Sequence, residues 1–461
     1  MAKTEILTLN DKNNKKVEFE GWIDSIRDHG NLIFLDVRDR SGIVQAIIFD
    51  KKLIDDISKL NPEDLVSFVG TVQKRPEKLI NPEILTGTIE IAIESFKIIS
   101  TSKSLPFEIN QDTTGISEQL RLKYRYLDLR NSRMKNNIFL RHQTLQFLRD
   151  FLNKANFWEI ETPNLTKGTP EGAREYIVPS RLQEGKFYVL PQSPQQFKQL
   201  LMVSGIEKYY QIARCFRDED QRGDRQPEFT QLDLEVSFYS QEEILNLLEE
   251  MMIKLINDVY PEKEITQKPF PRITYEDAMA KYQSDKPDIR KNKNNPAELA
   301  FCWIVDFPMF EYSKEEGKIV AIHHPFTRPK DEDIAKLNKS PLQTHAIAYD
   351  LVLNGHELGS GSLRIFEHDL QKKVFEILDL SKKEIESRFG HMLEALEFSP
   401  PPHGGFGLGL DRLLATIMNQ KSIREVIAFP KTGDAKDPLM NAPSEVSELI
   451  LKETHVKLRK S

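Results

Sequence analysis

The segment from Arg214 to Glu235 constrains the fold of this chain more than any other part of the sequence. Its first half is dense in arginine and acidic residues, and its second half alternates between polar and apolar side chains. A period of two predicts a strand with one face in the core. One face of that strand would carry Phe229, Gln231, Asp233 and Glu235, and the other would carry Leu232, Leu234, Val236 and Phe238.

This predicted strand has two interpretations. The row of hydrogen-bonding side chains, with arginines on the preceding loop, could hold a small polar molecule that carries phosphate. Alternatively, the segment is a solvated amphipathic hairpin with a charged turn, because runs of charge usually face water. The rest of the sequence has to decide between the two.

The composition bounds the class of protein. The chain has 461 residues, of which 29% are charged and 39% hydrophobic, an ordinary mixture for a globular protein of two to four domains. We find no run of about 18 apolar residues and no apolar region at the N-terminus, so we expect no membrane segment and a cytoplasmic protein. The two cysteines, Cys215 and Cys302, provide neither a disulfide framework nor a metal-ligand spacing. The net charge of −7 argues against nonspecific coating of nucleic acid, although a local patch could still bind one.

Residues 1–105 predict a small closed β-barrel of the OB type. Five short strands separated by turns, with one helical stretch near Leu53–Leu60, are typical of that barrel. We expect the strands at Val17–Ile23, Leu32–Arg38, Val44–Phe49, Leu65–Gln73 and Ile89–Ile99.

The remainder predicts an α+β domain over residues 136–461, after a polar linker or hinge at residues 106–135. Strands between helices without a regular βαβ rhythm indicate an antiparallel sheet flanked by helices. We expect helices at Asn136–Ala155, Pro194–Ser204, Gln241–Val259, Ser381–Leu396 and Asp411–Met418. We expect strands at Phe229–Phe238, Phe301–Asp306, Ala346–Leu353 and Glu357–Ile365.

The predicted barrel carries an aromatic residue on its polar face. In the strand Leu32–Arg38, Phe34 shares a face with Asp36 and Arg38. Such an aromatic is a candidate platform for stacking a base, worth about 1–3 kcal/mol, and a cross-strand packing role is the alternative. Residues 1–105 hold 15 basic and 17 acidic residues, so the barrel lacks the positive charge needed to coat a single strand nonspecifically. Recognition of a few bases in a nucleic-acid loop fits this charge better. Arg27, Gln45 and Glu90 are the candidate readers of base edges.

The segment Ser193–Lys198 predicts the start of a helix. Ser193 would be the N-cap, Pro194 the first helical residue, and Gln196 would complete a capping box. Gln195 and Lys198 are three residues apart and would share a face. Lys198 could meet a substrate carboxylate, and a solvated surface lysine is the alternative.

An Asn-Gly pair at 354–355 predicts a two-residue hairpin turn between apolar strands. That turn would place Asp350 opposite Gly359, and Asp350 and Glu357 as diagonal neighbours on one face. Two carboxylates at that spacing repel each other. A Mg²⁺ ion bound by both carboxylates and by the phosphates of a substrate would remove this repulsion. Simple alternation puts Arg364 on the other face, unless the glycines at 359 and 361 hold a bulge that reverses this.

A glycine-rich strand at 403–409 runs into a helix that contains Asp411 and Arg412. Glycines let a backbone approach a flat ligand, and Arg412 near the helix start could hold a phosphate. We find no Ser-His-Asp or Cys-His arrangement and no Walker or dinucleotide glycine motif. The arginines, lysine, carboxylates and glycines suit phosphate chemistry by positioning and charge neutralisation, without a protein nucleophile.

Together these segments resemble the class II aminoacyl-tRNA synthetases, and specifically the aspartyl-tRNA synthetases of bacterial type. The resemblance covers nearly the whole chain. Residues 157–166 look like the family's first motif, a dimer-interface element, residues 214–235 like its second, and residues 407–413 like its third. Between them lie further matching segments at 169–176, 190–198, 323–327 and 357–364. Because all of them occur in order, the solvated-hairpin interpretation of 214–235 becomes improbable.

The resemblance implies a ligase that uses ATP and Mg²⁺ to activate L-aspartate and attach it to tRNA. It implies that Arg217 holds the α-phosphate of ATP and stabilises the charge that develops during the in-line attack, and that Arg412 holds the γ-phosphate. The rest of the ATP site would be formed by Glu219, Gln226, Phe229 stacked on adenine, Glu357, Gly409 and Asp411. Asp350 and Glu357 would bind Mg²⁺.

The same resemblance implies an aspartate pocket and an anticodon surface. Lys198 and Arg364 would pair with the side-chain carboxylate of the substrate. The pocket would be completed by Glu171, Ser193, Gln195, Arg217, Asp233 and His323, with Glu171 on a loop that can close. In the barrel, Arg27, Phe34, Gln45 and Glu90 would contact the anticodon of tRNA(Asp). The family also implies a homodimer.

Two features depart from or complicate this pattern. Bacterial members carry a large inserted domain after a Ser-Asp-Lys-Pro-Asp segment, but here Ser284–Asp288 leads through residues 289–299 directly to Phe301. His29 is typical of members that also charge tRNA(Asn), whereas Lys78 is typical of members that do not. Charging of tRNA(Asn) therefore stays open at this point.

Two other functions remain as alternatives. An asparaginyl- or lysyl-tRNA synthetase is the nearest enzyme, and Lys198 and the bacterial-type motifs oppose it. A noncatalytic OB-fold binding protein with a degenerate synthetase body is the other, and the presence of Arg217, Glu357 and Arg412 opposes that one.

Overall fold

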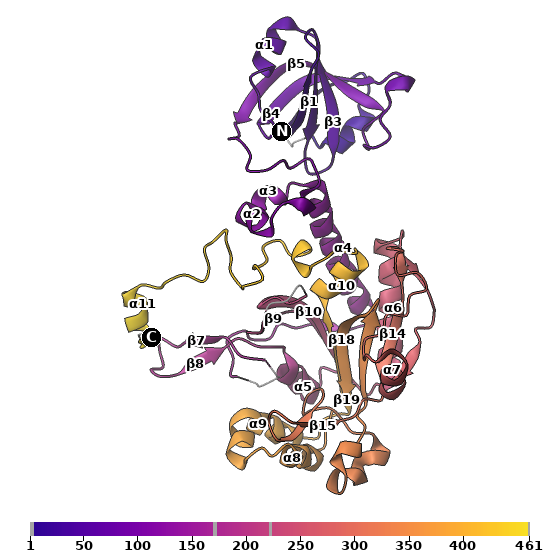
Figure 1. Cartoon of the computed structure of the whole chain (residues 1–461), viewed down its shortest axis with the longest axis vertical. Helices are drawn as coiled ribbons and strands as arrows, with labels where there is room; N and C mark the ends of the chain where they lie inside the picture. Colours follow the sequence, from indigo (N-terminus) through magenta and orange to yellow (C-terminus); the bar gives the residue numbers. More distant parts are fainter. Residues whose placement is uncertain (1–3, 169–172, 221–223, 460–461) are drawn as a thin grey trace. The chain divides into compact units, whose positions relative to one another are not determined.

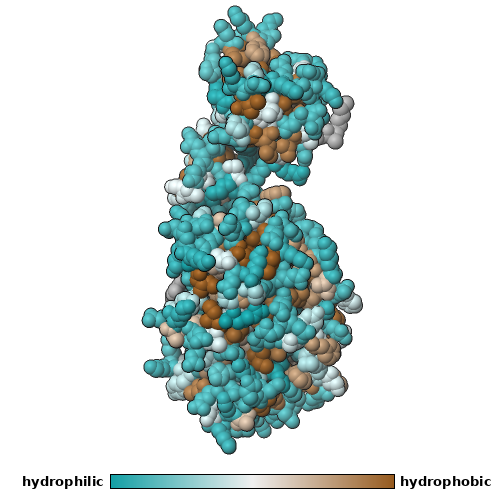
Figure 2. Space-filling view, turned by 90° about the vertical axis from the view of Figure 1, so that its right-hand side faces the viewer, coloured by the Kyte–Doolittle hydropathy of each residue, from teal (hydrophilic) through white to brown (hydrophobic). Residues whose placement is uncertain are grey.

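The computed structural model describes residues 4–168, 173–220 and 224–459. The chain divides into two compact units, Met1–Thr113 and Thr114–Ser461, and each is considered separately (Figure 1). In the part of the chain that the structure describes, no helix has the length and apolar character needed to cross a membrane. Hydrophilic side chains predominate on the face drawn in Figure 2, and hydrophobic ones form scattered groups between them.

The first unit is a closed five-stranded barrel, which confirms the predicted OB-type fold. Its order is β1–β2–β3–β5–β4, with β3 and β5 parallel and the other pairs antiparallel. Alternating apolar residues fill the interior, and Ile23, Leu35 and Phe68 are fully buried. The strands are β1 (Lys16–Asp28), β2 (Ile33–Arg38), β3 (Ile43–Ile48), β4 (Leu65–Lys74) and β5 (Ile89–Ser100), with helix α1 (Lys51–Ile57) and 3-10 turns η1 (Ile6–Asp11) and η2 (Glu77–Leu79).

The second unit is built on an eight-stranded sheet, and its mixed α+β class is confirmed. The order is β12–β14–β17–β18–β19–β10–β9–β6, antiparallel except for the parallel outer pairs β12–β14 and β6–β9. These strands are β6 (Trp158–Glu159), β9 (Lys208–Phe216), β10 (Glu228–Ser237), β12 (Arg272–Thr274), β14 (Phe301–Val305), β17 (Ala348–Leu353), β18 (His356–Leu363) and β19 (His403–Gly409).

Helices and short two-stranded sheets surround this sheet (Figure 1). The longest, α4 (Ser132–Lys154) and α6 (Gln241–Val259), pack against the main core cluster. The other helices are α2 (Glu118–Lys123), α3 (Arg125–Asp128), α5 (Gln195–Val203), α7 (Tyr275–Tyr282), α8 (His368–Ile377), α9 (Lys382–Leu396), α10 (Leu410–Ile417) and α11 (Glu448–Glu453). The 3-10 turns are η3 (Thr113–Gly115), η4 (Asp331–Asn338), η5 (Pro341–Gln343) and η6 (Ile423–Glu425). The small strands are β7 (Ile177–Pro179), β8 (Phe187–Val189), β11 (Glu264–Ile265), β13 (Glu298–Leu299), β15 (Phe310–Ser313) and β16 (Lys318–Ala321).

The predicted strand after Arg214 is β10, and its apolar face is in the core, as the alternation required. Leu232, Leu234 and Val236 are fully buried. The prediction for Phe238 is wrong, because β10 ends at Ser237 and Phe238 has a left-handed φ of 64° with 63% of its surface exposed. A left-handed residue breaks the alternation of faces, so the pattern could not extend to it.

Strand β19 explains why the sequence needs its glycines. Its register places Gly409, Gly407 and Gly405 directly opposite Gln231, Asp233 and Glu235 of β10. Residues opposite each other in an antiparallel pair share a face of the sheet. The glycines therefore leave room for the polar row of β10, and we expected them instead to make room for a flat ligand.

The N-terminal capping of α5 differs from the prediction. The helix begins at Gln195 with Pro194 as its N-cap, and no side chain caps it. Ser193 lies one residue too early for the predicted capping box, and its Oγ accepts a hydrogen bond from the Gln195 amide at 3.3 Å.

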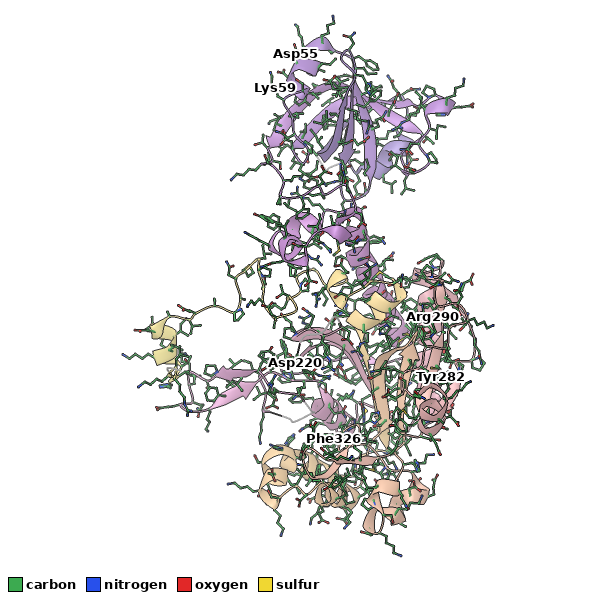
Figure 3. All side chains as sticks on the ribbon, in the orientation of Figure 1. Asp55, Lys59, Asp220, Tyr282, Arg290 and Phe326 are labelled. Atoms are coloured by element: carbon green, nitrogen blue, oxygen red, sulfur yellow. The ribbon has the colours of Figure 1, made fainter. Side chains whose placement is uncertain are left out.

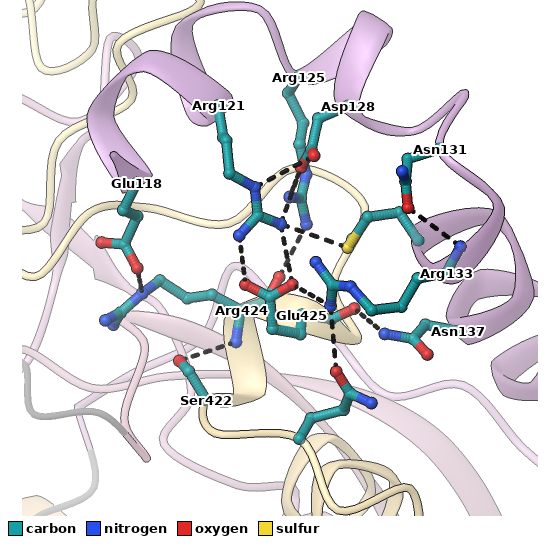
Figure 4. Close-up of polar contacts among 12 residues, drawn as sticks. Glu118, Arg121, Arg125, Asp128, Asn131, Arg133, Asn137, Ser422, Arg424 and Glu425 are labelled. Carbon is teal, nitrogen blue, oxygen red and sulfur yellow. Dashed lines mark hydrogen bonds and ion pairs between the residues drawn. The ribbon is translucent and has the colours of Figure 1, made fainter. Parts of the chain in front are cut away.

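Buried arginines organise residues 118–133, all of which we predicted to be linker or hinge (Figure 4). Arg121 forms ion pairs with Asp128 at 3.0 Å and with Glu425 at 2.8 Å. Arg125, only 2% exposed, pairs with Asp128 at 2.5 Å and donates to the carbonyls of residues 424, 427 and 428. Arg133 also contacts Glu425, at 2.7 Å. This network ties α2, α3 and the start of α4 to η6.

The pKa of Glu425 makes this network testable. Burial raises that pKa, but hydrogen bonds from Arg121 and Arg133 outweigh burial and lower it from 4.5 to about 2. A lowered folded-state pKa stabilises the fold above the unfolded value and loses that effect as pH falls toward the folded value. We predict that Glu425→Gln lowers the free energy of unfolding at neutral pH, and that its difference from the wild type shrinks between pH 4.5 and 2.

Denaturant unfolding across that pH range is the measurement. The exposed Glu453→Gln is the control and should not change stability at any pH. A difference for Glu425→Gln that stays constant down to pH 2 would contradict the assigned network.

Candidate active site

A polar cavity of about 410 Å³ lies on the face of the sheet formed by β10, β18 and β19. Most of the predicted catalytic and substrate residues line it: Ser193, Gln195, Lys198, Arg217, Glu219, Gln226, Phe229, Asp233, His323, Glu357, Arg364, Gly409, Asp411 and Arg412. Asp350 does not line this cavity but contacts His323, which does. Glu171 lies outside the described residues.

Two cations and two carboxylates form a buried cluster at the floor of the cavity. Lys198 Nζ lies 3.0 Å from Asp233 Oδ1 and 3.5 Å from Glu235 Oε2. Arg364 Nε lies 2.9 Å from Glu235 Oε1, and Arg364 Nη2 donates to Glu235 Oε2 at 3.3 Å. All four side chains are at most 2% exposed. The sequence placed Glu235 in the polar row of β10 but gave it no role.

The charges in this cluster are mutually stabilised. Burial raises the pKa of Glu235, but Arg364 and Lys198 outweigh burial and hold that pKa below its usual value, so Glu235 is ionised. Burial, followed by the charge of Arg364, holds the pKa of His324 well below its usual value, so His324 is neutral. The cluster therefore carries two positive and two negative charges before any substrate binds.

Each cation of this cluster keeps at least one hydrogen-bond donor that no described residue accepts. Lys198 has three N–H groups and donates one hydrogen bond, to Asp233, while Glu235 forms an ion pair with it at 3.5 Å. Arg364 has five, of which Glu235 takes two, and Ser362 and His324 take one each. One donor on each of two adjacent cations is the arrangement that a single carboxylate can satisfy with both of its oxygens.

Several buried polar atoms around the cavity lack partners among the described residues. They are Gln195 Nε2, Asp233 Oδ2, Arg217 Nε and His323 Nδ1. Buried polar groups are nearly always hydrogen-bonded in folded proteins. Because all four residues line the cavity, these atoms indicate a site for a polar ligand.

The hairpin β17–β18 brings Glu357 and Arg364 into the same cavity through a bulge. Leu353 pairs with His356 and Val352 with Glu357 as predicted, but Asp350 then pairs with Ser360 and not with Gly359. The extra residue at position 358 shifts the register and reverses the alternation of faces. The bulge we considered is therefore present, just before the glycines.

The pKa values around His323 fit a divalent cation. Burial and the nearby Asp350 raise the pKa of Glu357, and Arg412 lowers it. Burial lowers the pKa of His323, but Asp350, whose Oδ1 lies 3.2 Å from His323 Nε2, raises it overall. No group of three or more potential ligands converges among the described residues. Mg²⁺ takes only one or two carboxylates and completes its shell with phosphate oxygens and water, so Asp350 and Glu357 fit it.

Arg217 and Arg412, which we predicted to bind phosphate, line the same cavity. The Arg217 guanidinium carbon lies 5.0 Å from the centre of the Phe229 ring. Arg412 donates to the carbonyl of Glu357 at 2.7 Å and forms an ion pair with Asp224 at 3.3 Å. Glu219 forms an ion pair with Arg225 at 3.0 Å. An aromatic face and two guanidinium groups therefore border one cavity.

Two predicted nucleotide residues make contacts within the protein. Asp411 accepts hydrogen bonds from Arg141 at 2.5 Å and from the Thr230 amide at 2.9 Å, which joins α10 to α4 and β10. Gln226 uses its amide nitrogen and oxygen on the backbone of Lys431, at 3.0 and 2.7 Å. Both line the cavity, and both hold the elements that form it.

The predicted anticodon residues lie together on the barrel. Arg27 binds Asp36 through both terminal nitrogens and donates to Gln45 at 3.3 Å. Gln45 donates in turn to Glu90 at 3.2 Å. Phe34 pairs with Arg27 across β1 and β2, and its ring is nearly perpendicular to the His29 ring, with 5.7 Å between the two ring centres.

The residues that position this site were not predicted from the sequence. Glu235 could have been found from its place in the polar row, and Gly405 from its spacing of two from Gly407 and Gly409. Arg141 and Lys431 gave no local signal, because Asp411 and Gln226, which they bind, lie more than 200 residues away in sequence.

Two family models match the chain. One, described as tRNA synthetases class II (D, K and N), matches residues 117–433. The other, described as an OB-fold nucleic acid binding domain, matches residues 17–99.

Curated relatives match over nearly their full length. The aspartate–tRNA(Asp/Asn) ligase of Dictyoglomus turgidum is 43% identical, over 98% of this chain and 97% of the relative. The aspartate–tRNA ligase of Staphylococcus haemolyticus is 39% identical, over 97% of each. The first alignment spans 577 positions, and this chain has 461 residues, so that relative has residues without a counterpart here.

Solved structures share the fold. The asparaginyl-tRNA synthetase of Pyrococcus horikoshii, complexed with asparaginyl-adenylate, superposes with a TM-score of 0.75 at 22% identity, over 94% of this chain and 98% of that chain. A putative aspartyl-tRNA synthetase of Leishmania major gives 0.76 at 20% identity, over 93% and 94%.

The packing of Gly405 against Glu235 gives a direct test of the cluster. A Cβ at Gly405 would lie 1.9 Å from Glu235 Oε2 and 2.3 Å from the Leu234 carbonyl. We predict that Gly405→Ala lowers the free energy of unfolding by about 1–3 kcal/mol or more. Gly433→Ala, where a Cβ meets nothing within 4 Å, is the control. Equal stability of the two variants in denaturant unfolding would contradict the packing described.

Proposed function

The chain belongs to the class II tRNA synthetases of the D, K and N group, and we propose that it is an aspartate–tRNA ligase, which activates L-aspartate with ATP and transfers it to tRNA(Asp). The observation that carries the proposal is the buried pair of Lys198 and Arg364 at the floor of the cavity, each with at least one N–H that no described residue accepts. The names of the curated relatives support the same activity.

Lys198 and Arg364 distinguish aspartate from asparagine. The two oxygens of an aspartate side chain can accept both remaining N–H groups. An asparagine amide has one oxygen, and its NH₂ group would face a cation that also has only donors. A site with buried charged donors rejects such an analogue strongly, because the donors are left without an anionic partner.

The other predicted pocket residues would hold the backbone of the substrate. Gln195 Nε2 and Asp233 Oδ2 are buried without a partner among the described residues, and they supply one donor and one acceptor. A carboxylate acceptor suits the substrate ammonium, and an amide donor suits its α-carboxylate. Ser193, Arg217 and His323, which line the same cavity, would complete the pocket, together with Glu171.

Activation needs the α-carboxylate and the α-phosphate of ATP to meet in line. Phe229 would stack on adenine and Arg217, 5.0 Å from its ring, would hold the α-phosphate. A carboxylate oxygen forms a bond to the α-phosphorus, and pyrophosphate leaves with the electron pair of the broken P–O bond. Arg412 would hold the γ-phosphate, and Glu219, Gln226, Gly409 and Asp411 would shape the nucleotide site. Asp350 and Glu357 would hold Mg²⁺, which supplies positive charge to the phosphate oxygens.

Transfer completes the reaction. The terminal ribose hydroxyl of tRNA attacks the activated carbonyl, and AMP leaves. The barrel would recognise the anticodon, with Phe34 as the stacking platform and with Arg27, Gln45 and Glu90 as readers of base edges.

We propose tRNA(Asn) as a second substrate. His29 lies against Phe34, where it can affect a base stacked there, and several curated relatives are named aspartate–tRNA(Asp/Asn) ligases. Lys78, the residue that argued the other way, lies in η2 and is exposed.

A homodimer in the cytoplasm completes the proposal. The segment that resembles the dimer motif contains Trp158, 64% exposed in edge strand β6, and Leu165, also exposed. Large exposed apolar side chains at a sheet edge suit a subunit interface.

Exchange of labelled pyrophosphate into ATP tests the activation step. We expect exchange with aspartate, and none with asparagine or lysine. Lys198→Ala should reduce aspartate-dependent exchange by about two to four orders of magnitude, because breaking a buried pair costs about 3–5 kcal/mol. Lys254→Ala, which removes an exposed lysine, is the control. Exchange with asparagine alone, or near-normal exchange in Lys198→Ala, would refute the proposed specificity.

Aminoacylation kinetics test the barrel. We predict that the wild type charges both tRNA(Asp) and tRNA(Asn). Phe34→Ala should raise the KM for both tRNAs by about 5- to 150-fold, because the variant loses the stacking of one base, worth about 1–3 kcal/mol. Exchange, which needs no tRNA, should be unchanged. Phe49→Ala, which truncates an exposed aromatic side chain of the same unit, is the control. Charging of tRNA(Asp) alone would contradict the proposal that tRNA(Asn) is a second substrate. An unchanged KM in Phe34→Ala would show that Phe34 does not contact the anticodon.

A further inference from the structure

A second cavity of about 340 Å³ borders the active-site cavity. Asp224, Arg412 and Ile423 line both cavities and form the boundary between them. The remaining walls come from the hairpin turn at Asn354 and His356, from the end of α10 and the loop after it, and from Arg290. None of the roles assigned above uses this space.

Basic side chains predominate on its walls. Arg290, Arg412 and Lys421 line it, and Asp224 is its carboxylate. Asp224 is 3.3 Å from Arg412 and half exposed. Lys421 is exposed and forms no ion pair with any residue that the structure describes. The hydroxyls and amides of Thr416, Asn419 and Ser422 complete a wall suited to an anion.

The segment that replaces the inserted domain supplies Arg290 (Figure 3). Asp288 holds the Arg290 guanidinium through two hydrogen bonds, at 3.0 and 2.8 Å, and the carbonyl of Lys293 accepts a third at 3.2 Å. Lys286, from the same segment, lies near Glu357. The segment from Ser284 to Arg290, to which we assigned no role, therefore places two basic side chains beside the part of the active site proposed to bind phosphate, although it also contains Asp285 and Asp288.

The arginine network of Figure 4 fixes the opposite wall. Arg133 binds both Glu425 and the side-chain oxygen of Gln420, at 2.7 and 3.1 Å. The loop that carries Lys421 is thereby held between two anchored residues. A rigid wall positions an exposed lysine better than a free loop does.

We propose that this second cavity binds inorganic pyrophosphate as it leaves the active site, and delivers it in the reverse reaction. The inference rests on the proposed function, which produces pyrophosphate beside Arg412. Arg290 and Lys421 form a subsite beyond Arg412, and they touch the product after the P–O bond has broken. They therefore bind free pyrophosphate and contribute nothing to the affinity for ATP.

A single-turnover measurement tests the subsite. The enzyme with bound aspartyl-adenylate is isolated and mixed with increasing pyrophosphate, and the rate of ATP formation gives the affinity for pyrophosphate. We expect Arg290→Gln and Lys421→Gln each to weaken that affinity about fivefold, and the double variant to weaken it further. The KM for ATP in the forward direction should stay at the wild-type value.

Lys293→Gln is the matched control, because Lys293 is an exposed lysine of the same segment outside the cavity. Lys421→Gln alters only an exposed side chain and should not affect folding. It therefore still tests the subsite if Arg290→Gln destabilises the protein. Inorganic phosphate should compete with pyrophosphate only weakly, because it has one phosphate group and less negative charge, whereas pyrophosphate has two groups.

Two outcomes would overturn the inference. Unchanged pyrophosphate affinity in the double variant would show that Arg290 and Lys421 do not bind pyrophosphate. A rise in the KM for ATP as large as the loss of pyrophosphate affinity would show that both residues belong to the ATP site. Failure of the proposed function is distinguishable, because the wild type itself would then form no aspartyl-adenylate.

Discussion

The buried cluster of Lys198, Arg364, Asp233 and Glu235 is the interaction on which the catalytic unit depends. Two cations in a dry interior need anions and hydrogen-bond acceptors, or the cost of removing them from water would prevent folding. The acids come from one strand, β10, and the cations from α5 and from the end of β18. Strand β19 has to be rich in glycine, because Gly405 and Gly407 lie opposite the acids. One electrostatic requirement thus determines the composition of three elements.

The same cluster connects folding to chemistry. It is neutral in sum before substrate binds, so the fold tolerates the empty site, and each cation still has one donor for a carboxylate. The phosphate side shows the same division. Asp411 and Gln226 hold α10 and the C-terminal segment in place, while Arg217 and Arg412 lie at the cavity with guanidinium groups that can meet phosphate. The arginine network around Glu425 fixes the loop after α10 and the wall of the neighbouring basic cavity.

Much of this fold and site could be predicted from local sequence. The alternation from Phe229 to Val236 gives strand β10 and its core face, and the Asn-Gly pair gives the turn between β17 and β18. The resemblance brought together Lys198, Glu357, Arg364 and Arg412, which do line one cavity. The errors lie where geometry depends on a single unusual residue. A left-handed Phe238 ended β10 early, and an extra residue at position 358 changed the partner of Asp350. Contacts across hundreds of residues, such as those of Arg121 with Glu425, leave no local pattern at all.

We propose that Lys198 and Arg364, neutralised by Asp233 and Glu235, select a side-chain carboxylate. Calorimetric titration of the wild-type protein with aspartate and with asparagine, without ATP or tRNA, is the decisive measurement. We predict that aspartate binds at least 100-fold more tightly, since a buried charged donor without its partner costs about 3–5 kcal/mol. Equal affinity for the two amino acids would contradict it.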